Sequence, residues 1–263
     1  MRTRDGMTEL TAAEDRKYRA PALEKGLDVL ELLSAHGTPM TPSQMSSVLG
    51  RSVSELFRMI QVLEFRGYIE QSPQGYSLTT RLFTLGMAQV PVKSLSELAL
   101  PVMRDLAFAT GQSCHLVVPS GDQIVVVARI ESPGDLGYSV RIGYRRNLIE
   151  ATSGLLLYGC ASPATKQVLR ERLSARFGQQ KTNRFVKLAE AAGVQGHVER
   201  DSDFVKGVTD LVAPIMGADG VIATLITPFI QQTPPTCDMA ECVVRLRDAA
   251  AHISQLTGGV SQP

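Results

Sequence analysis

Residues 41–78 decide the fold, and they read TPSQMSSVLGRSVSELFRMIQVLEFRGYIEQSPQGYSL. The letters TPSQ at 41–44 are typical of a helix start, because Thr caps the helix, Pro suits its first position and Gln reaches back to the cap. Gly50 ends this short helix. The letters SVSE at 52–55 begin a second helix with the same cap spacing. Two short helices joined by a tight turn are therefore predicted.

The second of these helices has one face suited to burial and one suited to contact. The apolar positions that recur with the helical period are Leu56, Met59, Ile60 and Leu63. The positions on the opposite face are Ser54, Arg58, Gln61 and Phe65. Arg and Gln side chains can reach base edges in a DNA groove, although a merely solvated helix face would carry the same residues.

A hairpin follows the second helix. Residues 68–72 and 76–78 are β-prone and flank Pro73-Gln74-Gly75, whose exposed tip can reach a phosphate or the minor groove. Two capped helices followed by such a wing are typical of a winged helix-turn-helix. We expect the DNA-binding residues to be Ser52, Ser54, Arg58, Gln61 and Gln74.

Composition favours a soluble protein with two domains. The chain has 263 residues, of which 44% are hydrophobic and 20% charged. It has neither an apolar run long enough for a membrane span nor a signal peptide, so we expect a cytoplasmic protein without a membrane partner. The cysteines are scattered without zinc-ligand spacing, and we predict neither a metal nor a cofactor; they are Cys114, Cys160, Cys237 and Cys242.

Net charge is close to neutral in both halves. With 27 Lys and Arg against 26 Asp and Glu in the whole chain, there is no basic field to supply strong nonspecific DNA binding. Affinity must then come from two recognition helices placed about one DNA turn apart. We therefore expect a homo-oligomer, a dimer or a dimer of dimers, on a palindromic operator of double-stranded DNA.

Helix-capping residues, glycines and prolines along the chain predict a division into four segments. They are a flexible arm at 1–20, the winged helix-turn-helix domain at 21–79, a linker helix at 80–93 and a second, larger domain at 94–258. The first helix begins at Pro21 and ends at Gly37, with Leu23, Leu27, Leu30 and Leu33 expected to face inward. A third capping pattern at 94–97 predicts the start of the helix that opens the last segment.

The last segment reads as strands and helices in an α+β arrangement. The predicted strands are 114–118, 124–129, 138–142, 197–199, 211–216 and 221–227, and the predicted helices are 155–161, 163–173, 185–192 and 238–256. An antiparallel sheet with helices packed on it is suited to holding a small molecule.

The whole layout resembles the IclR family of bacterial transcriptional regulators, over about residues 21–258. The stretches that carry the resemblance are 23–33, 49–69, 76–78, 101–106, 131–133, 151–154, 207–208 and 213–215. The resemblance implies a winged helix-turn-helix, a linker helix and a GAF-like effector-binding domain with an antiparallel sheet and flanking helices. Family members work as dimers or dimers of dimers and often control the catabolism of aromatic or small organic acids.

The sequence departs from the family pattern at two places. The recognition helix has Val53 and Glu55 where the family usually carries Lys and Thr, and the capping pattern explains Glu55. In the effector domain, Arg200 and Asp210 stand where the family often has an acidic residue and a Cys. This exchange changes the polarity of the pocket, so the ligands known for the family do not carry over.

A helix start in the effector domain suggests the charge of the ligand. Free amides at Ser153 and Gly154, together with the helix dipole, favour an anion, and the resemblance implies that family pockets use these amides. We expect Arg200 to supply the counter-charge and Tyr138 and Asp210 to shape the pocket of a carboxylate effector. The alternative is that Ser153 only caps the helix, while Arg200 and Asp210 pair with each other.

These observations predict a ligand-responsive DNA-binding regulator of a small-molecule catabolic operon, and no enzyme. The alternative is a bifunctional DNA-binding protein with an enzymatic C-terminal domain. Against it, Cys114 and His115 are neighbours in a predicted strand, so their side chains point to opposite faces and cannot act as a nucleophile and its base.

Overall fold

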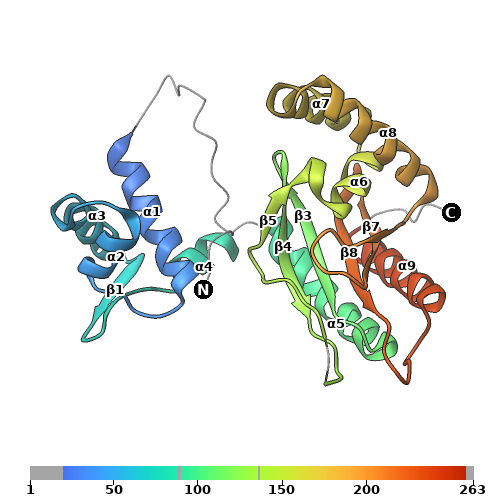
Figure 1. Cartoon of the computed structure of the whole chain (residues 1–263), viewed down its shortest axis with the longest axis horizontal. Coiled ribbons are helices and arrows are strands. Elements are labelled where there is room, and N and C mark those ends of the chain that lie inside the picture. Colours follow the sequence, from blue (N-terminus) through green and yellow to red (C-terminus); the bar gives the residue numbers. More distant parts are fainter. Residues whose placement is uncertain (1–19, 88–89, 136, 259–263) are drawn as a thin grey trace. The chain divides into compact units, whose positions relative to one another are not determined.

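The chain divides into two compact units, Met1–Gln89 and Val90–Pro263. The computed structural model describes residues 20–87, 90–135 and 137–258 (Figure 1). The division falls inside the predicted linker at 80–93. All but the last residue of the arm predicted at 1–20 lies outside the described residues.

The N-terminal unit contains the two capped helices and the wing. Its elements are α1 (Pro21–His36), α2 (Pro42–Leu49), α3 (Val53–Phe65), β1 (Ile69–Ser72), β2 (Gly75–Leu78) and α4 (Arg81–Met87). Complete capping boxes open α2, with Thr41 and Gln44, and α3, with Ser52 and Glu55. Strands β1 and β2 pair antiparallel, with Ser72 opposite Gly75 across the loop.

The wing is tied to the loop that precedes α2. Met40 and Tyr76 exchange two backbone hydrogen bonds, of 2.9 and 2.8 Å. Gly75 permits this approach, because a Cβ there would lie 2.5 Å from the Met40 carbonyl carbon and its φ of +127° disfavours other residues. The hairpin is thus fixed to the helical part of the unit.

The core of this unit is smaller than the sequence predicts. Its buried residues are Val29, Leu33, Met40, Met45, Leu56, Ile60, Ile69 and Tyr76. On α1, Leu33 is buried as expected, but Leu23 is 63% exposed and Leu27 is 48% exposed. The expectation for these two was wrong, because both fully buried residues of α1 lie in its second half.

The C-terminal unit is a six-stranded antiparallel sheet with helices on both faces (Figure 1). In spatial order the strands are β5 (Arg145–Asn147), β4 (Gln123–Ile130), β3 (Cys114–Ser120), β8 (Gly220–Ile230), β7 (Val208–Gly217) and β6 (Val198–Asp201). Helices α5 (Val90–Thr110) and α9 (Met239–Leu256) pack on one face. The other face carries α6 (Thr152–Gly159), α7 (Pro163–Phe177) and α8 (Gln179–Gln195), preceded by the short helix η1 (Leu148–Glu150).

Two details of this unit differ from the prediction. Helix α5 begins at Val90, so the pattern at 94–97 lies inside a helix and does not start one. Residues 138–142 form no strand, and β5 pairs with β4 instead. The Val140 amide donates to the buried His115 ring at 2.8 Å, which takes the place of a ladder partner. The α+β class and the antiparallel sheet with flanking helices are as predicted.

Candidate functional site

The exposed face of α3 carries the residues predicted to read DNA. Ser54, Arg58 and Gln61 are all exposed, while Leu56 and Ile60 are buried on the opposite side. The structure thus leaves the predicted reading face open to a partner.

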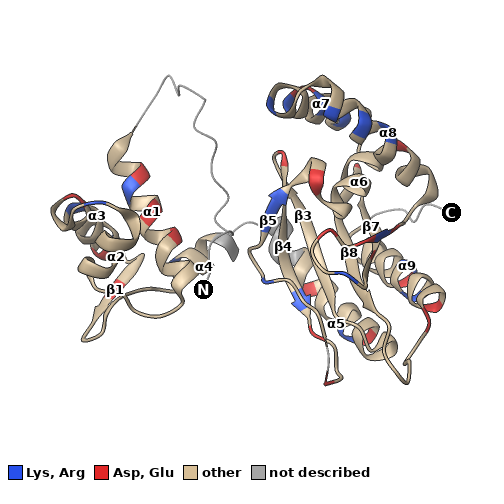
Figure 2. Ribbon diagram, in the orientation of Figure 1, with Lys and Arg blue, Asp and Glu red and all other residues tan. Residues whose placement is uncertain are grey.

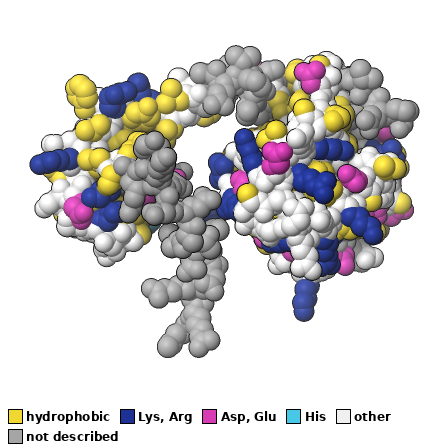
Figure 3. All heavy atoms as spheres, turned by 90° about the horizontal axis from the view of Figure 1, so that it is seen from above, with side chains coloured by type: hydrophobic (Ala, Val, Ile, Leu, Met, Phe, Trp, Pro, Cys, Tyr) yellow, Lys and Arg dark blue, Asp and Glu magenta, His cyan; other side chains and the backbone are white. Residues whose placement is uncertain are grey.

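The same face also carries two exposed phenylalanines, of which only Phe65 was expected there. Phe57 is 48% exposed and Phe65 is 89% exposed. Phe57 was missed, although its spacing of three from Ser54 and four from Gln61 places it on this face. An exposed Phe beside Arg58 can contact a thymine methyl group. Figure 3 shows one side of the whole molecule, where charges of both signs are interspersed with hydrophobic side chains.

Ser52 and Glu55 are occupied in holding the start of α3. The Ser52 hydroxyl accepts from the Glu55 amide at 3.3 Å, and the Glu55 carboxylate accepts from the Ser52 amide at 3.1 Å. Lys25 of α1 donates to the same carboxylate at 2.9 Å. The Lys25 hydrogen bond, followed by the bonds from Ser52, lowers the pKa of Glu55 to about 2. The charge of Glu55 is therefore compensated inside the unit.

The tip of the wing is open. Gln74 is exposed between β1 and β2, and its backbone N–H donates to the Ser72 hydroxyl at 3.3 Å. Its side chain is therefore open to a partner.

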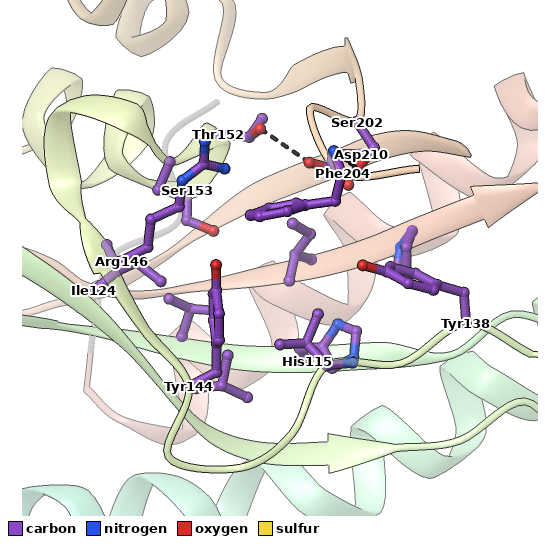
Figure 4. Close-up of a pocket in the computed structure, with 16 residues that line it drawn as sticks. His115, Ile124, Tyr138, Tyr144, Arg146, Thr152, Ser153, Ser202, Phe204 and Asp210 are labelled. Carbon is purple, nitrogen blue, oxygen red and sulfur yellow. Dashed lines mark hydrogen bonds between the residues drawn. The ribbon is translucent and has the colours of Figure 1, made fainter. Parts of the chain in front are cut away.

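A cavity of about 520 Å³, open mouth included, lies in the C-terminal unit between the sheet and the start of α6 (Figure 4). Its walls are mostly apolar or aromatic. The lining residues are His115, Val117, Ile124, Val126, Tyr138, Val140, Tyr144, Arg146, Ala151, Thr152, Ser153, Ser202, Phe204, Asp210, Ile226 and Pro228.

Three hydroxyl groups point into this cavity. Those of Tyr144 and Ser153 point toward one another, and that of Tyr138 faces them from the other end (Figure 4). Within the described chain, none of the three has a hydrogen-bond partner, although Ser153 is only 4% exposed. Burial raises the pKa of both tyrosines, so their hydroxyls stay protonated and can donate. Such groups are suited to a polar ligand.

The cavity also contains one charge of each sign. Asp210 accepts from the Thr152 hydroxyl at 3.0 Å, and burial raises the pKa of its carboxyl. The Arg146 guanidinium lies 4.4 Å from the centre of the Phe204 ring and 3.3 Å from the Asp203 carboxylate. Arg146 is thus held in place by an aromatic ring and an acid at the mouth of the cavity.

The start of α6 presents free amides beside these side chains. Those of Thr152 and Ser153 donate to no acceptor in the described chain, and no side chain caps the helix. The Gly154 amide, in contrast, donates to the Ala151 carbonyl at 3.0 Å. An added Cβ at Gly154 would overlap the Leu148 carbonyl, so this glycine serves close packing against η1.

The structure brings together three of the five predicted effector residues. Tyr138, Ser153 and Asp210 line the cavity, and Gly154 and Arg200 do not. Arg200 is opposite Asp210 in the β6–β7 register, but it is exposed and its guanidinium pairs with Asp203 at 3.4 Å. Arg200 therefore lies outside the cavity, and the alternative Arg200–Asp210 pair is not formed.

Sequence reasoning missed Arg146 and Phe204. The spacing of two between Tyr144 and Arg146 was the available signal, because alternate residues of an extended segment share a face. Phe204 gave none, since it reaches the cavity from the turn between β6 and β7.

Comparison with known families agrees with both halves of this description. The sequence model of the IclR helix-turn-helix domain matches residues 22–73, and that of the bacterial transcriptional regulator IclR C-terminal domain matches residues 87–255. The chain belongs to the IclR family of bacterial transcriptional regulators. The IclR-family protein therefore combines a DNA-binding domain with a ligand-binding C-terminal domain.

Individual relatives cover nearly the whole chain. The glycerol operon regulatory protein of Streptomyces griseus is 25% identical over 90% of this chain and 96% of its own. The HTH-type transcriptional regulator KdgR of Escherichia coli is 27% identical over 82% of this chain and 85% of its own. An IclR homologue from Microbacterium hydrocarbonoxydans, solved with 4-hydroxybenzoate, has a TM-score of 0.73 at 21% identity, over 90% of this chain and 98% of its own.

The described ranges show neither a metal-binding cluster nor a membrane-spanning helix. Among residues 20–87, 90–135 and 137–258, no cluster of three or more His, Cys, Asp and Glu side chains could hold a metal ion. None of the helices within those ranges has the length and apolar character of a membrane span.

Proposed function

We propose that this IclR-family regulator binds a small organic acid with a flat apolar body in the cavity, and that binding changes its affinity for the operator of a catabolic operon. The observation that carries the proposal is the apolar cavity into which Arg146 and three unpartnered hydroxyls project. Pockets of this kind bury the body of a ligand and orient it with a few polar groups.

The carboxylate of the ligand is assigned to the end of the cavity formed by Arg146 and the start of α6. The free amides of Thr152 and Ser153 and the helix dipole favour an anion there. Arg146 takes the role that was expected of Arg200, because its guanidinium is at the cavity and can bond a carboxylate through two nitrogens. Tyr138, at the other end of the cavity, is left to read a hydroxyl group on the body, while Asp210 shapes the wall beside Thr152.

Calorimetric titration tests the ligand class. We expect 4-hydroxybenzoate or another small acid of a panel to bind, and its neutral amide to bind at least about tenfold more weakly. Arg146→Gln should weaken acid binding about 10- to 100-fold. Arg200→Gln is the matched control, since Arg200 also pairs with Asp203 but lies outside the cavity. Equal affinity for acid and amide, or an equal loss in both variants, would show that the pocket does not select an anion.

The DNA partner is assigned to α3. We propose that Arg58 and Gln61 contact bases in the major groove, that Gln74 contacts the backbone, and that a homo-oligomer reads a palindromic operator. The exposure of all three side chains supports the assignment. Ser54 lies on the same face near the start of α3, whereas Ser52 acts mainly as the cap.

Replacing Arg58 by alanine should cost about 1–3 kcal/mol of operator binding. The reason is the loss of hydrogen bonds to a base edge, so binding to unrelated DNA should change much less. Gel-shift titration at fixed salt with operator and unrelated duplexes measures both. Arg66→Ala, at the C-terminal cap of α3, is a matched control that should affect both duplexes alike. If Arg58→Ala leaves operator affinity unchanged, another face of the unit docks on DNA.

We also propose that the C-terminal domain has no enzymatic activity. The Cys114 thiol is fully buried, donates to the Met103 carbonyl at 3.3 Å, and has a pKa raised by burial to about 12. His115 lines the cavity on the other face of the sheet. The two side chains therefore cannot form a nucleophile and its base. The regulatory names of the relatives support the same conclusion.

A further inference from the structure

A second hollow of the C-terminal unit lies away from the ligand cavity. It has an empty volume of about 1010 Å³, open mouth included, and lies between the end of α8, β7 and α9. Its lining includes Val194 from α8, Pro214 from β7, and Val244, Arg247, Asp248 and Ala251 from α9. Val194 is 92% exposed and Val244 is 56% exposed. Two exposed valines beside a hollow are suited to contact with another protein surface.

The contribution of α9 to this hollow is a regular stripe. Val244, Arg247, Asp248 and Ala251 follow the spacing 0, 3, 4 and 7, which places them on one side of the helix. Ala240 and Gln255 extend the stripe at either end and are exposed. The core side of α9 is distinct from it, with Cys242, Leu246 and Ile253 buried.

The two charges at the centre of the stripe have no partner in the described part of the chain. Arg247 and Asp248 form no hydrogen bond or ion pair there, and as consecutive residues they do not face each other. On the other flank of α9, Arg245 and Glu241 do pair, at 2.6 Å. Figure 2 shows charges of both signs along α9.

The order of these residues is self-complementary. A twofold axis passing between Arg247 and Asp248 brings each residue of the stripe opposite the one equally far on the other side of the axis in a second, antiparallel helix. Arg247 then faces Asp248 of the partner subunit, and this pair occurs twice. Val244 faces the partner's Ala251, and Ala240 faces the partner's Gln255. An apolar Val–Ala pair and an Ala–Gln pair thus flank the two ion pairs on each side.

We propose that this face of α9 is an interface between two copies of the chain, formed by antiparallel packing of α9 on the partner's α9. The charge complementarity selects a second copy as the occupant, because an unrelated partner would need a matching pattern of its own. Ala240 and Ala251 allow the helices to approach closely, and Val194 provides apolar surface beside them. The interface lies in the C-terminal unit and does not depend on DNA or on the ligand.

Charge reversal in the full chain tests the pairing. Arg247→Asp places two acids opposite each other twice, and Asp248→Arg places two bases opposite each other twice. By sedimentation equilibrium, each single variant should associate at least about tenfold more weakly than the parent, so that assemblies of half the mass appear on dilution. The double variant, and an equimolar mixture of the two single variants, should regain the association of the parent.

Cysteine cross-linking tests the geometry independently. In the Val244→Cys, Ala251→Cys variant, the two new thiols are seven residues apart on one helix, about 10.5 Å, which is too far for a disulfide within one chain. Mild oxidation should therefore yield a reducible covalent dimer. The control is the Arg245→Cys, His252→Cys variant, which has the same spacing on the other flank. Any of four results would overturn the proposal. The parent could be monomeric, the single reversals could have no effect, the double variant and the mixture could fail to regain association, or cross-linking could be no greater than in the control.

Discussion

Replacing Gly159 by alanine is expected to lower the free energy of unfolding of the C-terminal unit by about 3 kcal/mol. Gly159 ends α6 where that helix crosses α8. An added Cβ there would overlap the Ala189 carbonyl oxygen, and one at Gly193 would lie 2.6 Å from the Gly159 carbonyl oxygen. Because backbone meets backbone at this crossing, the methyl group must force the helices apart.

Urea unfolding followed by circular dichroism measures this cost. Gly26→Ala in α1 is the control of opposite sign, because an added Cβ there meets nothing within 4 Å and alanine favours a helix by about 0.5–1 kcal/mol. Since α6 also lines the ligand cavity, Gly159→Ala should weaken ligand binding as well. A variant as stable as the parent would mean that α6 and α8 are not in close contact.

The C-terminal unit is expected to lose about 3 kcal/mol of stability as the pH falls from 6.5 to 4, because of His115. Burial, followed by repulsion from Arg129, lowers the pKa of this histidine from 6.5 to about 4. Between these values the unfolded chain binds the proton and the folded chain does not, so acid favours unfolding. Above pH 6.5 both states are neutral and His115 adds no slope.

Unfolding measured at pH 7 and pH 5 checks this dependence, which should amount to about 2 kcal/mol from His115 alone. His115→Gln keeps an acceptor for the Val140 amide but cannot be protonated, so its stability should change less over this interval. Glu55 contributes little to this difference. Its pKa is lowered from 4.5 to about 2 in the folded chain, so the stability that it contributes is lost only below about pH 4.5. The same slope in both proteins would show that His115 is not buried as a neutral ring.

Local signals in the sequence were sufficient to predict the two capped helices and the wing of the DNA-binding half. The caps of α2 and α3 depend on residues three positions apart, so the sequence displays both partners at once. The two backbone hydrogen bonds between Met40 and Tyr76 join segments that are distant in the sequence, and no local pattern predicts them. The exposure of Leu23 and Leu27 was misjudged for the same reason, since periodicity shows a face but not what covers it.

Only some of the residues that line the cavity could be predicted from local patterns in the sequence. Ser153 could be placed from a helix start and a resemblance, and it lines the cavity, as Tyr138 does. Arg146 lines the cavity where Arg200 does not, and it reaches the cavity from β5, a strand of three residues that periodicity cannot detect. Arg200 and Asp210 are direct neighbours across two strands, yet only Asp210 lines the cavity, and this difference depends on the turn carrying Asp203 and Phe204.

If a ligand in the cavity governs DNA binding, as we propose, fluorescence anisotropy with operator DNA should detect the coupling. The operator dissociation constant is measured with and without a saturating acid that calorimetry has shown to bind. We expect the constant to change by about 5- to 150-fold in the parent, which corresponds to a coupling of about 1–3 kcal/mol. In Arg146→Gln, the same ligand concentration should leave the constant nearly unchanged. An operator affinity that does not respond to a bound ligand in the parent would show that the cavity does not control DNA binding.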